Sequence, residues 1–316
     1  MTYGIGCNCV PKLEKIEKYV NNGMSELYFP FKNENLGDRN TNPSEMKEKA
    51  KKYLEECNKG GKLDKWIENN FKIHVHTEQE YSDKKVDAPT YLGYGGNESK
   101  DSINRLSAII NAIAEKKLKL GIIEVHSAKP GTYEQLNEDL NKILEVSEQS
   151  KQKIGIEYGR KGTIFTGENI EKVKDYFKNE KNKFGMIFDI GLCYQDMGFD
   201  EGKLINELKK NKDWIIQIHW NNYGKSGPHT HLALFDDGGL ISSCTLCKIA
   251  DIVLNNKIKS NLWEAGSEKI FTSSSHNLDF MKKVLSEEDK DYLESLIKQV
   301  CEEKELKTSS APVINS

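Results

Sequence analysis

Histidine is rare in this chain of 316 residues, which contains seven, yet two of them stand close together at His229 and His231, in the segment SGPHTHLALFDDGG. A third, His219, lies shortly upstream in WIIQIHWNNY. Two histidines in one extended segment face the same side, and neutral imidazole binds Zn²⁺ and related ions. SGP marks a turn, so ordinary turn residues are the alternative, but the doubled histidine favours metal ligands.

Further residues of metal-binding type end short apolar runs. They are His76 in VHT, His126 in VHSAKPG, Glu157 in IEYG, Asp189 in FDIG, His219 in IHW and Glu264 in LWEAG. Each alone has an ordinary explanation, as a hydrogen-bonded core histidine or a solvated carboxylate. Together, three carboxylates that converge with three histidines would repel each other without a cation, and an unpaired carboxylate after an apolar run is costly to bury. The set therefore predicts a centre for Zn²⁺, Mn²⁺ or Fe²⁺.

Other residues of these types are weaker candidates. His74 points to the same face as His76 but one layer deeper, so we expect it in the core or behind the ligands. His276, in SSSHNLD, is predicted to lie on the surface. CTLC (244–247) and CNC (7–9) have metal or redox spacing, but no second CxxC completes a zinc site. We therefore interpret these cysteines as buried small hydrophobic residues.

The candidate ligands need a scaffold that gathers strand ends. Short apolar runs alternate with helical patterns, which indicates βα units around a parallel sheet. The clearest helical pattern is 99–117, behind possible caps at Ser99 and Ser102. The candidate strands are 3–9, 25–31, 71–77, 120–127, 153–159, 184–191, 214–220 and 259–266. These units predict an α/β fold, a single-domain (β/α)8 TIM barrel, in which active sites lie at the C-terminal ends of the strands.

The length suits one barrel without a second domain. We expect the metal-dependent barrel over residues 1–285, its C-terminal helix over 286–305 and a disordered tail over 306–316, where no apolar periodicity continues. The lysine-rich stretches 115–120 and 208–212 fall where helices end, so they are expected to complement helix C-termini and not to bind DNA.

The composition is that of a globular protein in water. Charged residues make up 30% and hydrophobic residues 37%, and the net charge of −3 gives no general sign of a nucleic-acid partner. The first residues lack the basic and apolar regions of a signal peptide, and no apolar run approaches the roughly 18 residues that cross a bilayer. Seven cysteines without framework spacing suit a reducing compartment. We therefore expect an intracellular protein, in cytoplasm or nucleus, without a membrane partner.

The order of these motifs at strand ends resembles endonuclease IV, the metal-dependent apurinic/apyrimidinic (AP) endonucleases, and its viral branch most closely. The resemblance extends over about residues 4–275 and includes FDIGLCY, IHWNN and SGPHTHLALFDDGG. Its superfamily, the xylose isomerase-like TIM barrels, also contains sugar-phosphate isomerases and epimerases and UV-damage endonucleases. A viral member would add the virion to the expected locations.

The resemblance implies two or three bound zinc ions, with Mn or Fe in some positions. The first ion would be held by His76, His126 and a bridging Glu157. The second would be held by Glu157, Asp189, His219 and Glu264.

The third metal position departs from the family pattern. The family takes a histidine three residues after the aspartate and an Asp-x-His in the loop after the seventh strand. Here Leu192 and His229 occupy two of those positions while His231 is retained, and Asn222 ends the usual His-x-Asn-Asp. The doubled histidine therefore looks like a remodelled third metal site.

The resemblance implies a hydrolase that incises duplex DNA 5′ to abasic sites, a step of base excision repair. A metal-bound hydroxide would attack phosphorus, with Glu157 and Glu264 as catalytic ligands and Glu264 orienting the hydroxide. The enzyme is expected to act as a monomer. Loops on the same face should contact DNA through Lys129, Arg160, Lys161, Lys225 and Tyr81.

Two other function classes remain open. An isomerase or epimerase acting on a sugar or sugar phosphate would use one metal, held by Glu157, Asp189, His219 and Glu264, with two carboxylates that shuttle a proton. Such a site has little need of His76 and His126 as ligands, so that pair favours the nuclease. A barrel without catalysis, used for binding, is suggested by Leu192, but intact ligands on six strands count against it.

Overall fold

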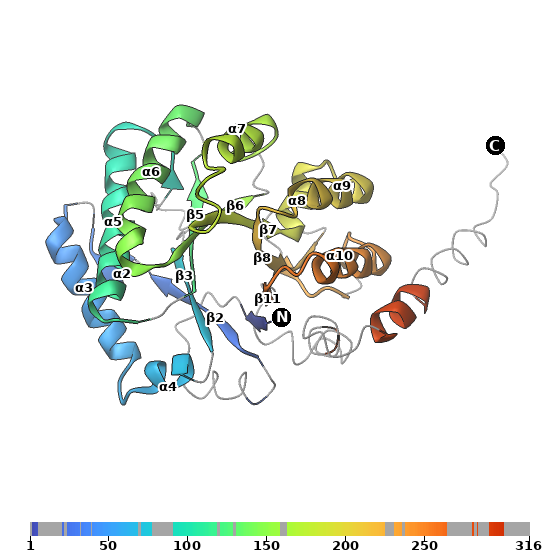
Figure 1. The fold of residues 1–316 in the computed structure, drawn as a ribbon, viewed down its shortest axis with the longest axis horizontal. Coiled ribbons are helices and arrows are strands. Elements are labelled where there is room, and N and C mark those ends of the chain that lie inside the picture. Colours follow the sequence, from blue (N-terminus) through green and yellow to red (C-terminus); the bar gives the residue numbers. More distant parts are fainter. Residues whose placement is uncertain are drawn as a thin grey trace.

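A ring of parallel strands surrounded by helices forms the protein, as the computed structural model shows (Figure 1). The structure describes residues 2–5, 21, 24–31, 33–38, 40–68, 71–77, 91–118, 121–128, 131–158, 163–224, 231–235, 238–263, 280, 283 and 291–299.

The ring is a closed barrel. Its strands are β1 (Thr2–Ile5), β2 (Glu26–Phe31), β3 (Lys72–Thr77), β5 (Ile122–Ser127), β6 (Lys153–Tyr158), β7 (Phe184–Asp189), β8 (Ile215–Trp220) and β11 (Ser260–Trp263). Each pairs with its neighbours in parallel, and the ring closes because β1 pairs with β11 and β3 with β5. This arrangement confirms the predicted (β/α)8 TIM barrel.

Three short strands lie outside the ring. β4 (Tyr91–Leu92) extends alongside β5, so that Tyr91 pairs with His126. β9 (Asn222–Tyr223) and β10 (His231–Leu232) pair in antiparallel fashion directly after β8. Both additions stand at the C-terminal ends of barrel strands, the face on which the candidate ligands were predicted.

Most predicted strands agree with the structure to within two residues. The prediction for 184–191 was wrong in its last two residues. The strand β7 ends at Asp189, and residues 190 and 191 already belong to the helix α8 (Ile190–Asp196). The carboxylate of Asp189 accepts the backbone N–H of Leu192, so Asp189 is the N-cap that ends the strand. The predicted residues 6–9 and 264–266 lie outside the described part of the chain.

Helices follow most strands and cover the outside of the barrel (Figure 1). Besides α8 they are α2 (Asn33–Leu36), α3 (Pro43–Cys57), α4 (Lys62–Glu68), α5 (Gly96–Glu115), α6 (Tyr133–Ser150), α7 (Glu168–Tyr176), α9 (Glu201–Asn211) and α10 (Ser243–Asn255). Side-chain oxygens of Asn42, Thr132, Asp200 and Ser242 accept a backbone N–H at the starts of α3, α6, α9 and α10. These caps satisfy backbone N–H groups of the first turn that have no partner within the helix, and so they fix where each of the four helices begins.

The prediction for the helix 99–117 was wrong at its start. The helix α5 begins three residues earlier, after Gly95, and has no side-chain cap. Ser99 and Ser102 are buried inside the helix and are not caps. The hydroxyl of Ser99 accepts the Gly95 N–H at 2.7 Å and donates to Asp139 on α6 at 2.6 Å. The serine therefore joins two neighbouring helices.

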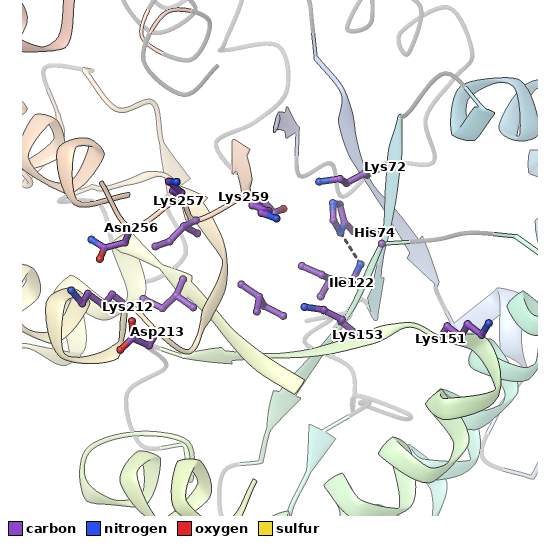
Figure 2. A pocket seen from close by; sticks show the side chains of 15 residues that line it. Lys72, His74, Ile122, Lys151, Lys153, Lys212, Asp213, Asn256, Lys257 and Lys259 are labelled. Carbon is purple, nitrogen blue, oxygen red and sulfur yellow. Dashed lines mark hydrogen bonds between the residues drawn. The ribbon is translucent and has the colours of Figure 1, made fainter. Parts of the chain in front are cut away.

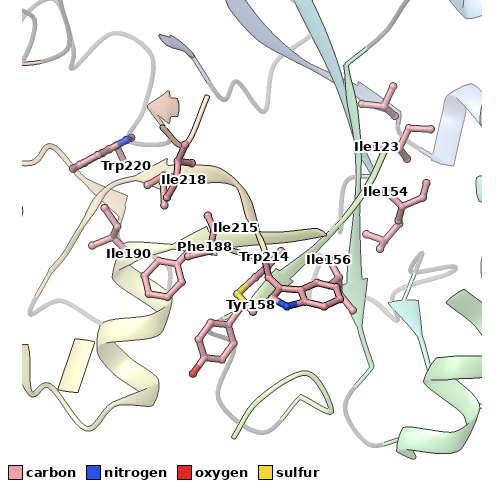
Figure 3. Close-up of a cluster of buried hydrophobic side chains, with 14 of the residues drawn as sticks. Ile123, Ile154, Ile156, Tyr158, Phe188, Ile190, Trp214, Ile215, Ile218 and Trp220 are labelled. Atoms are coloured by element: carbon pink, nitrogen blue, oxygen red, sulfur yellow. The ribbon is translucent and has the colours of Figure 1, made fainter. Parts of the chain in front are cut away.

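The main hydrophobic core lies between the strands and the helices. Alternate strand residues face outward, and among them Ile123, Ile154, Ile156, Phe188 and Ile218 are fully buried (Figure 3). This pattern follows from the two-residue period of a strand, which sends every second side chain to the helical layer.

The interior of the barrel is unusually polar for this fold, whose interiors are mostly filled by branched aliphatic residues. The inward positions of the strands carry Glu26, Tyr28, His74, His76, Glu124, His126, Glu157, Asp189, Gln217, His219 and Ser260, and all but His76 are buried. Buried polar groups require partners, so this interior is where the chemistry of the protein is expected.

Residues 291–299 are helical, within the predicted helix 286–305, and the tail 306–316 lies outside the described residues. Cys247 is a buried free thiol, as predicted for CTLC, whereas Cys244 forms a disulfide bond, contrary to that prediction. No helix in the described part of the chain is long and apolar enough to cross a membrane.

Candidate metal centre

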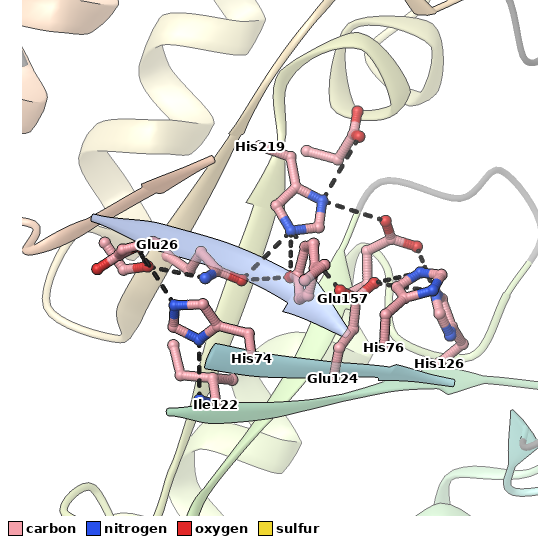
Figure 4. Close-up of polar contacts among 12 residues, drawn as sticks. Glu26, His74, His76, Ile122, Glu124, His126, Glu157 and His219 are labelled. Carbon is pink, nitrogen blue, oxygen red and sulfur yellow. Dashed lines mark hydrogen bonds and ion pairs between the residues drawn. The ribbon is translucent and has the colours of Figure 1, made fainter. Parts of the chain in front are cut away.

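Five of the predicted ligands converge at the C-terminal mouth of the barrel. Asp189 is the last residue of β7, and the other four are each the last but one of their strands: His76 in β3, His126 in β5, Glu157 in β6 and His219 in β8. Figure 4 shows His76, His126, Glu157 and His219 pointing toward one another around Glu124. The prediction that these strand ends meet is correct for these residues.

Glu124 is a member of this centre that the sequence analysis missed. It precedes His126 by two residues on β5 and is fully buried. Its Oε1 lies 3.1 Å from His126 Nε2 and 3.5 Å from His76 Nε2, while its Oε2 lies 3.7 Å from His219 Nε2. The carboxylate thus spans two sides of the centre. The i, i+2 rule that placed His74 beneath His76 would also have placed Glu124 beneath His126.

Glu157 spans the centre in the same way. Its Oε2 lies 3.1 Å from His126 Nε2, and its Oε1 lies 3.7 Å from His219 Nδ1. The same nitrogen of His219 is 3.9 Å from Asp189 Oδ2. His126 therefore faces two carboxylates, whereas His219 faces three, including Glu124.

These spacings fit atoms that share a metal ion. Ligand atoms about 2.0–2.2 Å from a tetrahedral ion lie roughly 3.3–3.6 Å from one another. Two groups in the described residues have converging ligand atoms, His76–Glu124–His126 and Glu124–Glu157–His219. Glu124 belongs to both. The donor set of imidazole and carboxylate suits zinc, manganese or iron.

The ionisation of the centre is strongly perturbed by its own charges. Burial raises the pKa of Glu124, but the imidazoles of His76 and His219 outweigh burial and hold that pKa well below its usual range. Burial lowers the pKa of His126, whereas the carboxylates of Glu157 and Glu124 raise it to about 9. Without a metal, protonated His126 therefore balances part of the carboxylate charge. A bound cation would take over that role.

Asp189 is held from two directions. Its Oδ2 accepts a hydrogen bond from Asn221 Nδ2 at 2.7 Å, and its Oδ1 accepts the Leu192 N–H at 2.6 Å. Asn221 Oδ1 in turn accepts the Gly191 N–H at 2.9 Å. Leu192, which stands where the resemblance implies a histidine, contributes its backbone here, and its side chain is buried.

Asn222, the other departure from the family pattern, organises the following loop. Its Nδ2 donates to the carbonyls of Leu234 and Ile241 at 2.9 and 3.0 Å, and its Oδ1 accepts the Ile241 N–H at 2.9 Å. An added Cβ on Gly239 would lie 2.3 Å from Asn222 Nδ2, so glycine permits this close approach. Asn222 is therefore a structural residue of the loop that carries His231.

Several predicted site residues lie outside the described part of the chain. They are Glu264, His229, Lys129, Arg160, Lys161, Lys225, Tyr81 and the surface candidate His276. Of His231 only the backbone is described, in β10. The remodelled third metal site and the DNA-contacting loops therefore remain predictions.

Two further side chains, the phenol ring of Tyr91 and the imidazole of His74, border the centre. The ring of Tyr91 on β4 lies edge-on to His126, with centroids 6.0 Å apart. His74 lies behind the ligands, as predicted, because its Nδ1 accepts the Ile122 N–H at 2.9 Å and its Nε2 is 3.3 Å from Glu26 Oε2.

A separate cavity of about 640 Å³ opens at the opposite end of the barrel, which we call the floor (Figure 2). Its wall includes Lys72, Lys151, Lys153, Lys212, Lys257 and Lys259. Lys151 and Lys212 are C-cap residues of α6 and α9, and Lys116 is that of α5. Lysines at helix C-termini were predicted for 115–120 and 208–212, and the positions of Lys116 and Lys212 agree with that prediction.

Comparison with known proteins places the fold but not the activity. No protein-family model matches the sequence, and no curated protein matches it. A xylose isomerase domain protein from Planctomyces limnophilus is similar in structure, with a TM-score of 0.58 and 13% identity over 90% of this chain and 98% of its own. Endonuclease IV from Thermus thermophilus gives 0.55 and 14% over 90% and 98%.

D-psicose 3-epimerase from Clostridium cellulolyticum gives a TM-score of 0.52 with 12% identity, covering 96% of this chain and 97% of its own. All three similarities extend over nearly the whole of both chains. The chain therefore has the TIM-barrel fold that endonuclease IV shares with a sugar epimerase and a xylose isomerase domain protein.

Proposed function

We propose that the protein is a metal-dependent phosphodiesterase that cleaves duplex DNA 5′ to abasic sites, as endonuclease IV does. The observation that carries this proposal is the pair of ligand groups that share Glu124. Two groups with a shared carboxylate suit two neighbouring cations, and two cations suit in-line displacement at phosphorus. The metal is proposed to be zinc, in two or three positions.

Each residue of the centre has a distinct task in this proposal. His76 and His126 would hold one cation through Nε2, and His219 with Asp189 would hold the other. Glu124 and Glu157 span both positions. Bound metal supplies a hydroxide at neutral pH and stabilises charge on the phosphate. Glu264 is proposed to complete the second position and to orient the hydroxide.

The rim of the centre suits a nucleotide that has left the duplex. The Tyr91 ring beside His126 is partly exposed and offers an aromatic surface at the mouth. Aromatic faces stack on flipped bases and sugars in enzymes that act on single nucleotides of a duplex. Lys129, Arg160, Lys161, Lys225 and Tyr81 are proposed to contact the DNA backbone around it.

A sugar isomerase or epimerase is the second candidate, favoured by the structural similarity to D-psicose 3-epimerase and to a xylose isomerase domain protein. It would bind one cation through Glu157, Asp189, His219 and Glu264, with two carboxylates moving a proton. In that case the contacts of His76 and His126 with Glu124 would serve structure alone.

One experiment separates the two candidates. Zinc content is measured for the wild type and for His76→Asn, and each protein is given a duplex with one tetrahydrofuran lesion, with and without chelator. The nuclease predicts two or more ions per chain, a chelator-sensitive nick 5′ to the lesion, and loss of both an ion and the nick in the variant. One ion, retained in the variant, and no nick would refute the nuclease.

A further inference from the structure

A continuous line of buried side chains connects the floor of the barrel to the metal centre. It involves three strands, running from Glu26 on β2 through Ser260 on β11 and Gln217 on β8 to Tyr28 on β2, and it ends at His219 on β8 (Figure 4). All five side chains are 3% exposed or less. Glu26 at one end contacts none of the candidate ligands in the described residues.

The hydrogen bonds near Glu26 have a fixed direction. A carboxylate only accepts, so the Ser260 hydroxyl donates its single proton to Glu26 Oε2, 2.6 Å away. The oxygen of Ser260 is then left to accept, and it does so from Gln217 Nε2 at 2.7 Å. This contact orients the amide of Gln217 with its carbonyl oxygen toward Tyr28.

The hydrogen bonds between Gln217 and the metal centre have the same donor-to-acceptor direction. The Gln217 carbonyl oxygen is an acceptor, so the Tyr28 hydroxyl donates its proton to it. Tyr28 Oη lies 2.6 Å from His219 Nε2 and has no second proton to give, so Nε2 carries the hydrogen. The Gln217 oxygen, 3.3 Å from the same nitrogen, is again an acceptor. The lone pair of neutral His219 is therefore on Nδ1, which faces Glu157 and Asp189.

Glu26 is held in its charged, accepting state by two donors. Lys72 Nζ lies 3.0 Å from Oε1, and His74 Nε2 lies 3.3 Å from Oε2. Because His74 Nδ1 accepts the Ile122 N–H, its hydrogen is on Nε2, the nitrogen that lies beside Glu26. Burial raises the pKa of Glu26, but His74 and Lys72 outweigh it and lower that pKa to about 2.

We propose that Glu26 is a positioning residue for the metal centre, which selects Nδ1 of His219 as the metal-binding nitrogen through Ser260, Gln217 and Tyr28. The proposal rests on the proposed metal dependence of the site. It assigns a role to a carboxylate at the opposite end of the barrel from the ligands. If the hydrogen bonds ran the other way, Tyr28 would donate to Nε2, and the proton of His219 would occupy Nδ1 where the cation must bind.

Glu26→Gln tests the direction of the hydrogen bonds with little change in the shape of the side chain. The amide of the variant can donate to Ser260, so both directions of the chain become available. Ser260→Ala removes the link while Glu26 remains. Lys72→Met is the matched control, because it removes one neighbour of Glu26 but leaves His74 beside the carboxylate and all four hydrogen bonds from Glu26 to His219 in place.

The measurement is the tautomer of His219, from the side-chain ¹⁵N resonances of the histidine-labelled full-length protein in chelator, together with Zn²⁺ affinity. We expect Nε2–H in the wild type and in Lys72→Met. In Glu26→Gln and Ser260→Ala we expect a measurable fraction of Nδ1–H and at least tenfold weaker zinc binding. A general loss of stability would not move the tautomer.

These measurements distinguish failure of the proposed metal dependence from failure of the positioning role of Glu26. If wild-type protein shows the Nε2–H tautomer but takes up no zinc, the proposed metal-dependent function is overturned. If it takes up zinc while both variants keep the wild-type tautomer and affinity, the positioning role of Glu26 is overturned.

Discussion

Asn221 offers a sharp test of how the metal centre is held. It is fully buried, donates to Asp189 at 2.7 Å and accepts from the Gly191 N–H at 2.9 Å. Asn221→Ala removes a hydrogen bond to a charged group, worth about 1.5–3 kcal/mol, and leaves a buried N–H unsatisfied, at a further cost of about 1–3 kcal/mol. We therefore expect the free energy of unfolding in chelator to fall by about 3–5 kcal/mol.

The same variant should also weaken metal binding. Without Asn221, one oxygen of Asp189 loses the donor that orients it, and loss of such a partner typically lowers metal affinity about 10–100-fold. Urea unfolding in chelator measures the stability, and competition with a chromophoric chelator measures zinc affinity.

Asn261 is the matched control for this experiment. It is equally buried, accepts from Trp220 Nε1 at 3.1 Å and donates to the Ile258 carbonyl at 3.2 Å, on the outer face of the barrel. Asn261→Ala should lose stability to a similar degree but keep zinc affinity. Equal zinc affinity in Asn221→Ala and wild type, or equal losses in both variants, would show that Asn221 does not position Asp189.

Three further outcomes follow from the buried charges. The pKa of Glu26 is lowered from 4.5 to about 2, so its ionisation stabilises the fold by on the order of 3 kcal/mol above pH 4.5. This stabilisation is lost as the pH falls toward 2. Glu26→Gln should therefore flatten that part of the pH dependence of the free energy of unfolding, measured in urea. The pKa of His126 is raised to about 9, so zinc uptake at pH 7 should release a proton, detectable in weakly buffered dye solution, and zinc affinity should rise up to pH 9. Glu124→Gln should lower zinc content below two ions per chain, measured by elemental analysis, and unchanged content would exclude Glu124 as a shared ligand.

The sequence predicted the barrel and the meeting of His76, His126, Glu157 and Asp189 because both follow from regular rules. Strand and helix periods alternate along the chain, and parallel strands of a barrel end on one face. Residues that close apolar runs therefore come together whatever the details of the loops.

Glu124 was not predicted because it lies one layer below His126, inside its strand and not at the strand end. The line from Glu26 to His219 was beyond sequence reasoning for a different reason. Its members lie far apart in the chain, with Tyr28 and Gln217 separated by 189 positions, and their contact depends on which strands adjoin across the barrel interior.

Asn222 illustrates a third kind of limit. The sequence shows only that an asparagine stands where the resemblance implies an aspartate, whereas the structure shows that its amide binds the loop backbone at four points. Sequence comparison identifies that a residue differs, but only coordinates show which groups it satisfies.

The closure of the ring has a consequence for how the chain reaches its native state. Thr2–Ile5, at the beginning of the sequence, pairs with Ser260–Trp263, so the barrel cannot be completed until some 260 residues have been synthesised. Contacts this distant in sequence slow folding because a long loop must close before they form. Nascent chains that end before residue 260 should therefore leave β1 and β8 with exposed edges, which makes them substrates for chaperones and proteases.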